Sequence, residues 1–234
     1  MKILQIRQTR QDYVATQIAR SQVKLRFCKV SLRDVARYQA IVTRDIGSGR
    51  APRECGPILC LGTRSGREVD VFRACFFGSR LRLWLARMSE IERHSFVSMC
   101  PPLEAVGRSD VQRLSTESVV GVEINPQAAR SDIWTGSFDE MPAAWTKTFG
   151  IVFSNSFDQS QDPYRTAMEW KRVLRPGGYL IFCFAEGVEP TTSDPVGDLR
   201  LEDARRLFGG ELLHFGDHGS RAGYSEVVLR LDRA

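Results

Sequence analysis

The chain has 234 residues, of which 42% are hydrophobic and 26% charged. This length and composition suit one hydrophobic core with a modest appendage and exclude a wholly disordered chain. No stretch approaches the roughly eighteen apolar residues that a transmembrane helix needs. Arg7 and Arg10 interrupt the apolar N-terminus far short of a secretory signal core. We therefore expect a cytoplasmic protein with no membrane span.

The six cysteines and three histidines predict no metal site. No two cysteines form a CxxC pair, so the spacing favours neither a zinc knuckle nor a disulfide framework. The cysteines are expected to be small buried residues. His214 and His218 flank Asp217, but this stretch is rich in glycine, and we interpret it as a solvated turn.

The net charge of +5 is unevenly distributed. Residues 1–53 carry twelve lysines and arginines against three aspartates, a net charge of +9, whereas the remaining residues carry a net charge of −4. A basic segment of this kind either attracts an anionic partner or is a solvated helix. Its basic residues are not contiguous and few aromatic residues lie among them, which disfavours nucleic-acid binding.

The elements begin with a helical N-terminal part. Residues 11–43 contain no glycine or proline and mix apolar with basic positions, which predicts one or two helices. Residues 47–52 break this pattern as a linker. We therefore divide the chain into a basic helical N-terminal arm or lid over residues 1–53 and a main domain over residues 54–234.

The main domain alternates short apolar runs with helical stretches, and the stretch 79–118 is interpreted as an insertion into this alternation. Buried strands alternating with helices predict an α/β fold with a doubly wound, mostly parallel sheet. Ligands bind such sheets at the carboxyl ends of the strands. The predicted strands are 58–61, 119–124, 149–154, 179–184, 211–215 and 226–231, and the predicted helices are 67–76, 163–174 and 201–208.

Two features together predict an adenosine pocket. The first strand runs into Gly62-Thr63-Arg64-Ser65-Gly66, and two glycines at a strand-to-helix turn let the backbone approach a ligand closely. The next strand ends near Glu123, where a carboxylate can accept hydrogen bonds from a ribose diol. Each feature also has a purely structural reading, as a packing turn or as a surface acid.

The segment Trp170–Ile181, read as WKRVLRPGGYLI, resembles the helix–turn–strand "hxRvLkPGGxLhh" of class I S-adenosylmethionine-dependent methyltransferases, and the likeness extends over about residues 57–184. It is closest to the small-molecule, type 11-like branch. The resemblance implies a Rossmann-like seven-stranded sheet and S-adenosylmethionine as cofactor.

The resemblance also implies roles for individual residues. The glycine-rich turn, with Gly62, Thr63, Arg64 and Gly66, corresponds to the motif beneath the methionine end of the cofactor. Glu123 corresponds to the ribose acid, Ser137 and Phe138 to adenine contacts, and Asn155 and Ser156 to the loop beside the sulfonium and the acceptor.

Departures from the family pattern affect the same site. The family usually has an acid at Cys60 and a glycine at Arg64, often an acid at Ser137, and many relatives have a histidine at Gln159. The general base is therefore open: Asp158 is one candidate, and otherwise an N-cap for the following helix, and His214 or His218 are others.

The resulting hypothesis is methyl transfer from S-adenosylmethionine to a small-molecule or glycan acceptor, with a hydroxyl as the acceptor group. The arginines of the arm and the insertion would suit an anionic acceptor. Two alternatives stay open: a binding protein that has lost catalysis, favoured by the departures at Cys60, Arg64 and Gln159, and an RNA-directed methyltransferase. The oligomeric state is open.

Overall fold

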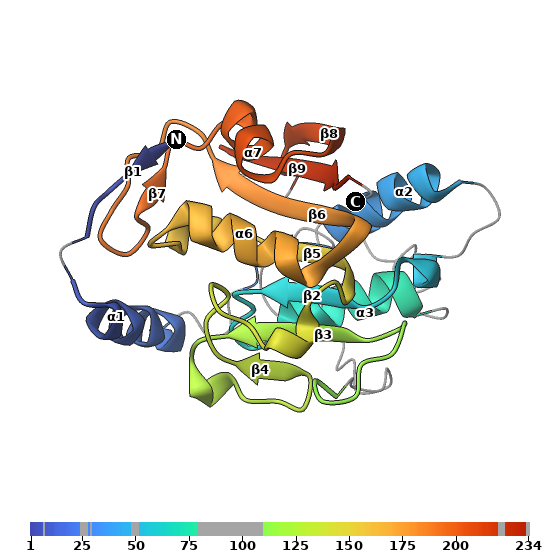
Figure 1. Ribbon diagram of the computed structural model, residues 1–234, viewed down its shortest axis with the longest axis horizontal. Coiled ribbons are helices and arrows are strands. Elements are labelled where there is room, and N and C mark those ends of the chain that lie inside the picture. The colour runs from blue at the N-terminus through green and yellow to red at the C-terminus, as the bar shows by residue number, and fades with distance from the viewer. Residues whose placement is uncertain are drawn as a thin grey trace.

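A seven-stranded sheet forms the centre of the protein (Figure 1). The computed structural model describes residues 1–6, 8–23, 28, 30–47, 52–78, 110–219 and 223–232. The strand order is β4-β3-β2-β5-β6-β9-β8. The strands are β2 (Ile58–Leu61), β3 (Val119–Glu123), β4 (Ile133–Thr135), β5 (Phe149–Ser154), β6 (Leu174–Ala185), β8 (Glu211–Asp217) and β9 (Tyr224–Arg230).

The sheet is mostly parallel, as the sequence predicts. Neighbouring strands from β4 to β6 are parallel, and β9 runs antiparallel to both of its neighbours. Strand β2 pairs with β3 on one side and with β5 on the other, so the chain changes direction across the sheet beside β2. In doubly wound folds a ligand crevice opens outside the carboxyl ends of the strands at such a switch point.

Helices cover both faces of the sheet. The helices α2 (Leu32–Ile46) and α3 (Arg67–Phe77) pack on one face, and α6 (Pro163–Val173) and α7 (Leu201–Phe208) pack on the other. The side chains of β2 alternate between these two layers: Ile58 and Cys60 join the cluster with α2 and α3, whereas Leu59 and Leu61 join the cluster with α6 and α7. This alternation explains why the strand is an unbroken apolar run.

The N-terminal part divides into two helices with different roles. Helix α1 (Arg10–Val23) stands beside the sheet domain, and before it β1 (Lys2–Ile3) pairs with β7 (Val196–Gly197) (Figure 1). Helix α2, in contrast, buries Val35, Tyr38 and Val42 completely in the core. Of the predicted arm over residues 1–53, only α1 therefore has the position of a cover, because α2 is one of the core layers.

Local signals in the sequence set several helix ends. Ser31 begins α2 with a capping box, in which its hydroxyl accepts from the amide of Asp34 and the Asp34 carboxylate accepts from the amide of Ser31. Asp162 caps α6, and Pro163 stands at the first helical position. Short 3₁₀ turns lie at Pro52–Cys55, Pro126–Ala128, Ala143–Trp145 and Phe157–Gln159.

The predicted elements agree with the structure to within a few residues, but the prediction missed the short strands β1, β4 and β7. The predicted insertion falls largely on residues 79–109, and the linker on residues 48–51, which lie outside the described residues. The five cysteines in the described part are buried and free of disulfides, as expected. No described helix is long and apolar enough to cross a membrane.

Candidate functional site

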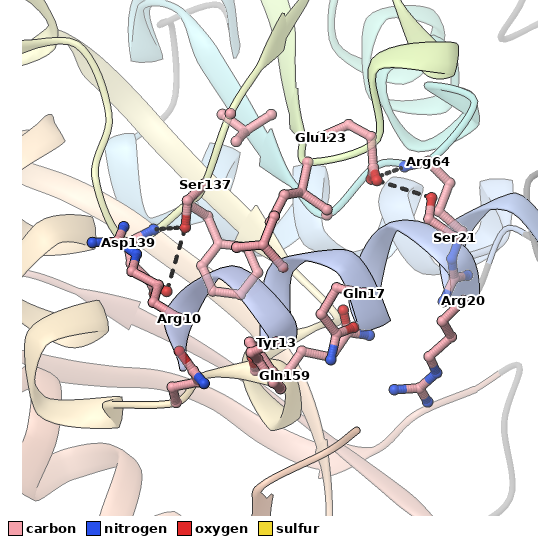
Figure 2. A pocket seen from close by; sticks show the side chains of 17 residues that line it. Arg10, Tyr13, Gln17, Arg20, Ser21, Arg64, Glu123, Ser137, Asp139 and Gln159 are labelled. Atoms are coloured by element: carbon pink, nitrogen blue, oxygen red, sulfur yellow. Dashed lines mark hydrogen bonds between the residues drawn. The ribbon is translucent and has the colours of Figure 1, made fainter. Parts of the chain in front are cut away.

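A pocket opens at the carboxyl ends of β2 and β3, beneath α1 (Figure 2). Its lining combines charged side chains with apolar ones such as Val122, Ile124 and Phe138. Its walls are α1, the turn after β2, the end of β3, the loop after β4 and the segment after β5. The sequence analysis assigns all of these segments except α1 to the cofactor or to the acceptor.

The glycine turn is shaped by a close contact below the pocket. Gly62 has a φ of +73°, and a Cβ at this position would lie 2.7 Å from the hydroxyl oxygen of Ser156. Arg64 adopts a φ of +48°, which is uncommon for a residue with a side chain. In this conformation its amide donates a hydrogen bond of 2.7 Å to Glu123. The arginine thus fits the position where the family usually has glycine.

Glu123 is the charged centre of the pocket. It ends β3, and the residue is only 3% exposed. Its Oε2 accepts from the amide of Arg64, and its Oε1 accepts from the amide of Asn125 at 3.1 Å and from the hydroxyl of Ser21 at 2.9 Å. Hydrogen bonds from three donors stabilise a buried carboxylate. The carboxylate is therefore already engaged by a hydroxyl group from α1.

The loop after β4 forms the wall opposite α1. Ser137 donates to Asp139 at 3.4 Å, and the Asp139 amide donates back to the Ser137 hydroxyl at 3.2 Å. Burial raises the pKa of Asp139, although hydrogen bonds from Thr166 and Ser137 act in the opposite direction. The ring of Phe138 stands edge-on to Trp170 at 5.8 Å. This wall therefore joins an apolar ring to a carboxyl group that is costly to ionise.

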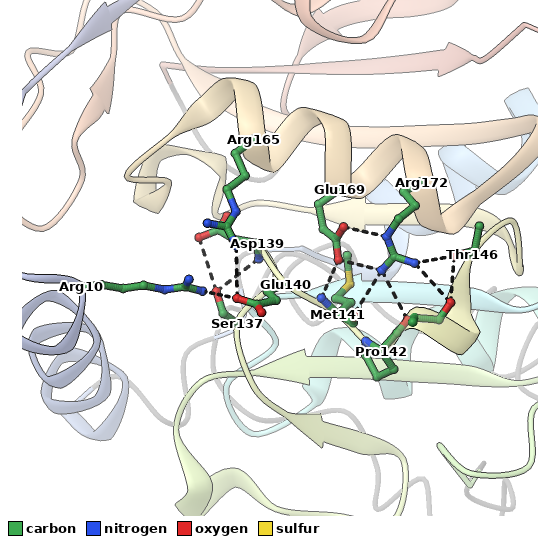
Figure 3. Close-up of polar contacts among 11 residues, drawn as sticks. Arg10, Ser137, Asp139, Glu140, Met141, Pro142, Thr146, Arg165, Glu169 and Arg172 are labelled. Carbon is green, nitrogen blue, oxygen red and sulfur yellow. Dashed lines mark hydrogen bonds and ion pairs between the residues drawn. The ribbon is translucent and has the colours of Figure 1, made fainter.

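Helix α6 holds this loop in place (Figure 3). Glu169 accepts a hydrogen bond of 2.5 Å from the amide of Met141 and pairs with Arg172 at 2.8 Å. Arg172 in turn donates to the carbonyl oxygens of Met141 and Pro142. Since α6 is anchored in the core through Trp170, the pocket wall is attached to a rigid element.

Helix α1 closes the pocket through hydrogen bonds to two other segments. The Tyr13 hydroxyl donates to the carbonyl of Gln159 at 2.7 Å, and Gln17 donates to the carbonyl of Ser193 at 2.7 Å. Arg20 donates to the same carbonyl at 3.0 Å and pairs with Asp194. The role of α1 was not visible in the sequence, because these partners lie more than 140 positions away.

The structure brings five of the predicted cofactor residues together around the pocket: Gly62, Arg64, Glu123, Ser137 and Phe138. The other four, Thr63, Gly66, Asn155 and Ser156, do not line it. All four are buried, Thr63 and Gly66 in the turn and Asn155 and Ser156 after the end of β5. At Gly66, which has a φ of +78°, an added Cβ would lie 2.7 Å from both Arg130 and Ile133, so this glycine serves packing at the start of α3.

Asp158 lies in the 3₁₀ turn Phe157–Gln159 and does not line the pocket. Its alternative reading as a helix N-cap is wrong, because α6 begins at Pro163 and Asp162 is the cap. The next residue, Gln159, lines the pocket, and its carbonyl oxygen accepts a hydrogen bond from Tyr13 on α1.

A buried acid beside the glycine turn was missed by the sequence analysis. Glu68, in the first turn of α3, is 2% exposed, and the amide nitrogen of Asn155 lies 3.5 Å from its carboxylate. Burial, and secondarily the charge of Glu68, raises the pKa of the Cys60 thiol. An acid thus lies near Cys60, where the family usually has one. Its signal was an acidic residue two positions after Gly66.

Both candidate histidine bases lie elsewhere. His214 contacts Glu226 at 3.0 Å, and ligand atoms of His218, Glu226 and Asp34 lie within 4.8 Å of one another. The Arg37 guanidinium already bonds both acids, at 2.6–3.0 Å. This group therefore fastens α2 to the sheet and does not line the pocket.

The comparisons with known proteins agree with this architecture. A family model described as "Methyltransferase domain" matches residues 106–182. A comparison with curated proteins gave no significant match. Among solved structures, Burkholderia thailandensis 1,6-didemethyltoxoflavin-N1-methyltransferase, with its substrate and S-adenosylhomocysteine bound, is 14% identical with a TM-score of 0.53, over 95% of this chain and 87% of that one.

A second similar structure is the complex between the Haloferax volcanii Trm112 methyltransferase activator and a methyltransferase, at 14% identity and a TM-score of 0.51 over 97% of this chain and 99% of that one. Identities this low show the fold alone. The family match adds the methyl-transfer activity and S-adenosylmethionine as its cofactor. In its fold and in the matched segment the chain therefore resembles the class I S-adenosylmethionine-dependent methyltransferases of the type 11 branch.

Proposed function

We propose that the protein transfers the methyl group of S-adenosylmethionine to a hydroxyl group of a small-molecule or glycan acceptor that enters beneath α1. The observation that carries this proposal is the narrow pocket between α1 and the carboxyl ends of β2 and β3. A pocket covered by a helix admits a small ligand more readily than a folded nucleic acid.

The residues present fit the cofactor. We assign the ribose hydroxyls to Glu123, whose carboxylate already accepts from a hydroxyl. Gly62 lines the pocket and has no side chain, so it would give the close backbone approach. Phe138 offers an apolar face for adenine, and Ser137 offers a polar edge. Thr63 and Gly66 would act by shaping the turn, and Asn155 and Ser156 would border the methionine end.

Glu68 is our candidate for the cofactor's ammonium group. A neutral thiol at Cys60 is a poor partner for a cation, whereas a carboxylate in the first turn of α3 supplies the negative charge from the neighbouring element. Asn155 lies beside that carboxylate and would orient it. In this assignment the carboxylate that binds the ammonium group lies on α3, whereas the family usually has it on the strand that corresponds to β2.

When bound, S-adenosylmethionine supplies an electrophilic methyl group on a sulfonium. The chain's task is to align the acceptor oxygen with that group and to exclude water, an effect of proximity and orientation. We keep Asp158 as the proposed base for the acceptor hydroxyl, because it lies in the turn Phe157–Gln159, next to Gln159, which lines the pocket.

A neutral polar acceptor fits better than the anionic one expected from the charge of the arm. Both arginines of α1 that line the pocket are already paired, Arg10 with Glu140 at 3.0 Å and Arg20 with Asp194. Three further polar side chains of the lining, Gln17, Gln159 and Gln161, carry no charge. The same pairing disfavours the RNA-directed alternative.

Two measurements test the proposal. Calorimetric titration with S-adenosylhomocysteine should give saturable binding with 1:1 stoichiometry, and incubation with methyl-labelled S-adenosylmethionine and small polyhydroxylated acceptors should transfer the label. Binding without transfer would favour the alternative of a binding protein. The cysteine at position 60, where the family usually has an acid, also favours that alternative. The absence of binding would contradict both.

A further inference from the structure

Helix α1 rests on the pocket through a mainly polar face. Its buried positions are Tyr13, Gln17 and Ser21, spaced four residues apart along one side of the helix. The corresponding buried face of α2 is mostly apolar, with Val35 and Val42. Apolar burial makes separation costly, whereas hydrogen bonds are exchanged for bonds to water at a small net cost. α1 is therefore built to leave its site more easily than α2.

One of these contacts occupies the cofactor's own partner. The Ser21 hydroxyl donates 2.9 Å to Oε1 of Glu123, and Figure 2 shows Ser21 and Arg64 converging on that carboxylate. A hydroxyl donating to this oxygen is the interaction assigned above to the ribose. Ser21 and a ribose hydroxyl therefore compete for the same acceptor.

We propose that α1 is an autoinhibitory latch, in which the Ser21 hydroxyl takes the place of a ribose hydroxyl on Glu123 and must be displaced when the cofactor binds. The proposal rests on the proposed function, since it needs Glu123 as the ribose acceptor. In the free protein, Ser21 supplies the buried carboxylate of Glu123 with a hydrogen-bond donor. Without this donor, Glu123 would lose a hydrogen bond to a charged group.

A second contact holds α1 to the segment with Ser193 and Asp194, two residues that do not line the pocket. Arg20 pairs with Asp194, and Gln17 and Arg20 both donate to the carbonyl of Ser193. Asp194 does not line the pocket, so the loss of its charge would loosen α1 without touching the cofactor. Weakening either of these two contacts should favour the state in which α1 is displaced from the pocket. Cofactor binding should therefore become tighter.

The first test measures S-adenosylhomocysteine affinity by calorimetry in the full chain. Ser21→Ala is expected to lower the dissociation constant about threefold to tenfold, since a competing hydrogen bond to a charged group is lost. Asp194→Asn should lower it in the same direction by about twofold. Thr16→Ala is the matched control, because the Thr16 hydroxyl bonds only the carbonyl of Asp12 within α1, and its affinity should be that of the wild type.

The second test follows amide hydrogen exchange in the wild-type chain with and without S-adenosylhomocysteine. Exchange in residues 10–23 should become faster on binding, while exchange in residues 62–66 becomes slower. An unchanged or weaker affinity in Ser21→Ala, or slower exchange in α1 on binding, would overturn the latch and leave the proposed function standing. If neither the wild type nor Ser21→Ala binds, the proposed function fails and the latch with it.

Discussion

The hydroxyl of Tyr38 on α2 donates a hydrogen bond of 2.7 Å to the carboxylate of Glu226 on β9, and both side chains are fully buried. Arg37 adds two further bonds to the same carboxylate, at 2.6 and 2.7 Å. A buried charge with this many partners is costly to break, because removing one side leaves the other unpaired. The contact fastens the second N-terminal helix to β9, which lies between β6 and the edge strand β8.

Two truncations should therefore behave differently. Removal of residues 1–23 takes away β1 and α1 and should leave a folded domain with a modestly lower melting temperature. Removal of residues 1–46 also deletes α2, including three side chains whose burial contributes about 1.5–3 kcal/mol each. This variant should show no cooperative thermal unfolding by circular dichroism. A cooperative transition in the longer truncation would mean that α2 is dispensable to the core.

Replacement of Glu123 should weaken cofactor binding. Glu123→Gln keeps the shape of the side chain but removes its charge, and hydrogen bonds to charged groups are worth about 1.5–3 kcal/mol. We expect at least a tenfold rise in the dissociation constant for S-adenosylhomocysteine, measured by calorimetry. Glu117→Gln, at an exposed position ahead of β3, is the control and should bind as the wild type does. Equal affinity in both variants would refute the ribose assignment.

The role of Glu68 can be separated from that of the pocket by comparing two ligands. Glu68→Gln should weaken binding of S-adenosylhomocysteine by about tenfold but leave binding of 5′-methylthioadenosine, which lacks the amino-acid part, unchanged. Glu202→Gln, an exposed acid in the first turn of α7, is the matched control. Equal losses for both ligands would point to a distorted turn and against an ammonium partner.

Gly66 should be needed for folding more than for binding. An alanine at this φ of +78° is strained, and its Cβ would press on Arg130 and Ile133. We expect Gly66→Ala to lower the free energy of unfolding by about 1–3 kcal/mol, measured by urea denaturation. Affinity measured on the folded fraction should change little. A stable variant that cannot bind S-adenosylhomocysteine would instead place Gly66 against the cofactor.

Asp132 should make the protein sensitive to acid. Burial opposes its ionisation, but hydrogen bonds from Arg130 and Arg73 prevail and hold its pKa below the ordinary value of 3.8. A lowered pKa in the folded state stabilises the fold above the ordinary pKa, and this stability is lost as the pH falls through the folded value.

The melting temperature of the wild type should therefore fall between about pH 5 and pH 3. Asp132→Asn should melt lower at pH 7, because two arginines lose a partner, and its melting temperature should fall less over the same acid range. Glu117→Gln serves again as the exposed control. A parallel acid profile in Asp132→Asn and the wild type would show that other carboxyl groups dominate.

The sequence by itself determined the sheet and one side of the pocket. Apolar runs bounded by glycine or polar residues predicted β2 and β5 with the bounds that the structure shows. They could be recognised because a parallel strand that is buried on both faces is apolar at successive positions. The glycine turn and Glu123 were found because parallel strands place their carboxyl ends together. The three-residue strand β4 was missed, since so short an element carries no periodic pattern.

Only the tertiary structure separated α1 from α2. Both helices carry basic residues and are similar in composition. Their roles depend on their distant partners: Ser21 on α1 bonds a carboxylate 102 positions away, and Tyr38 on α2 bonds one 188 positions away. Local propensity describes how a segment folds, whereas the partner of a buried polar group is set by the packing of distant elements. For this reason the acid Glu68 and the cover over the pocket became visible only when the chain was folded.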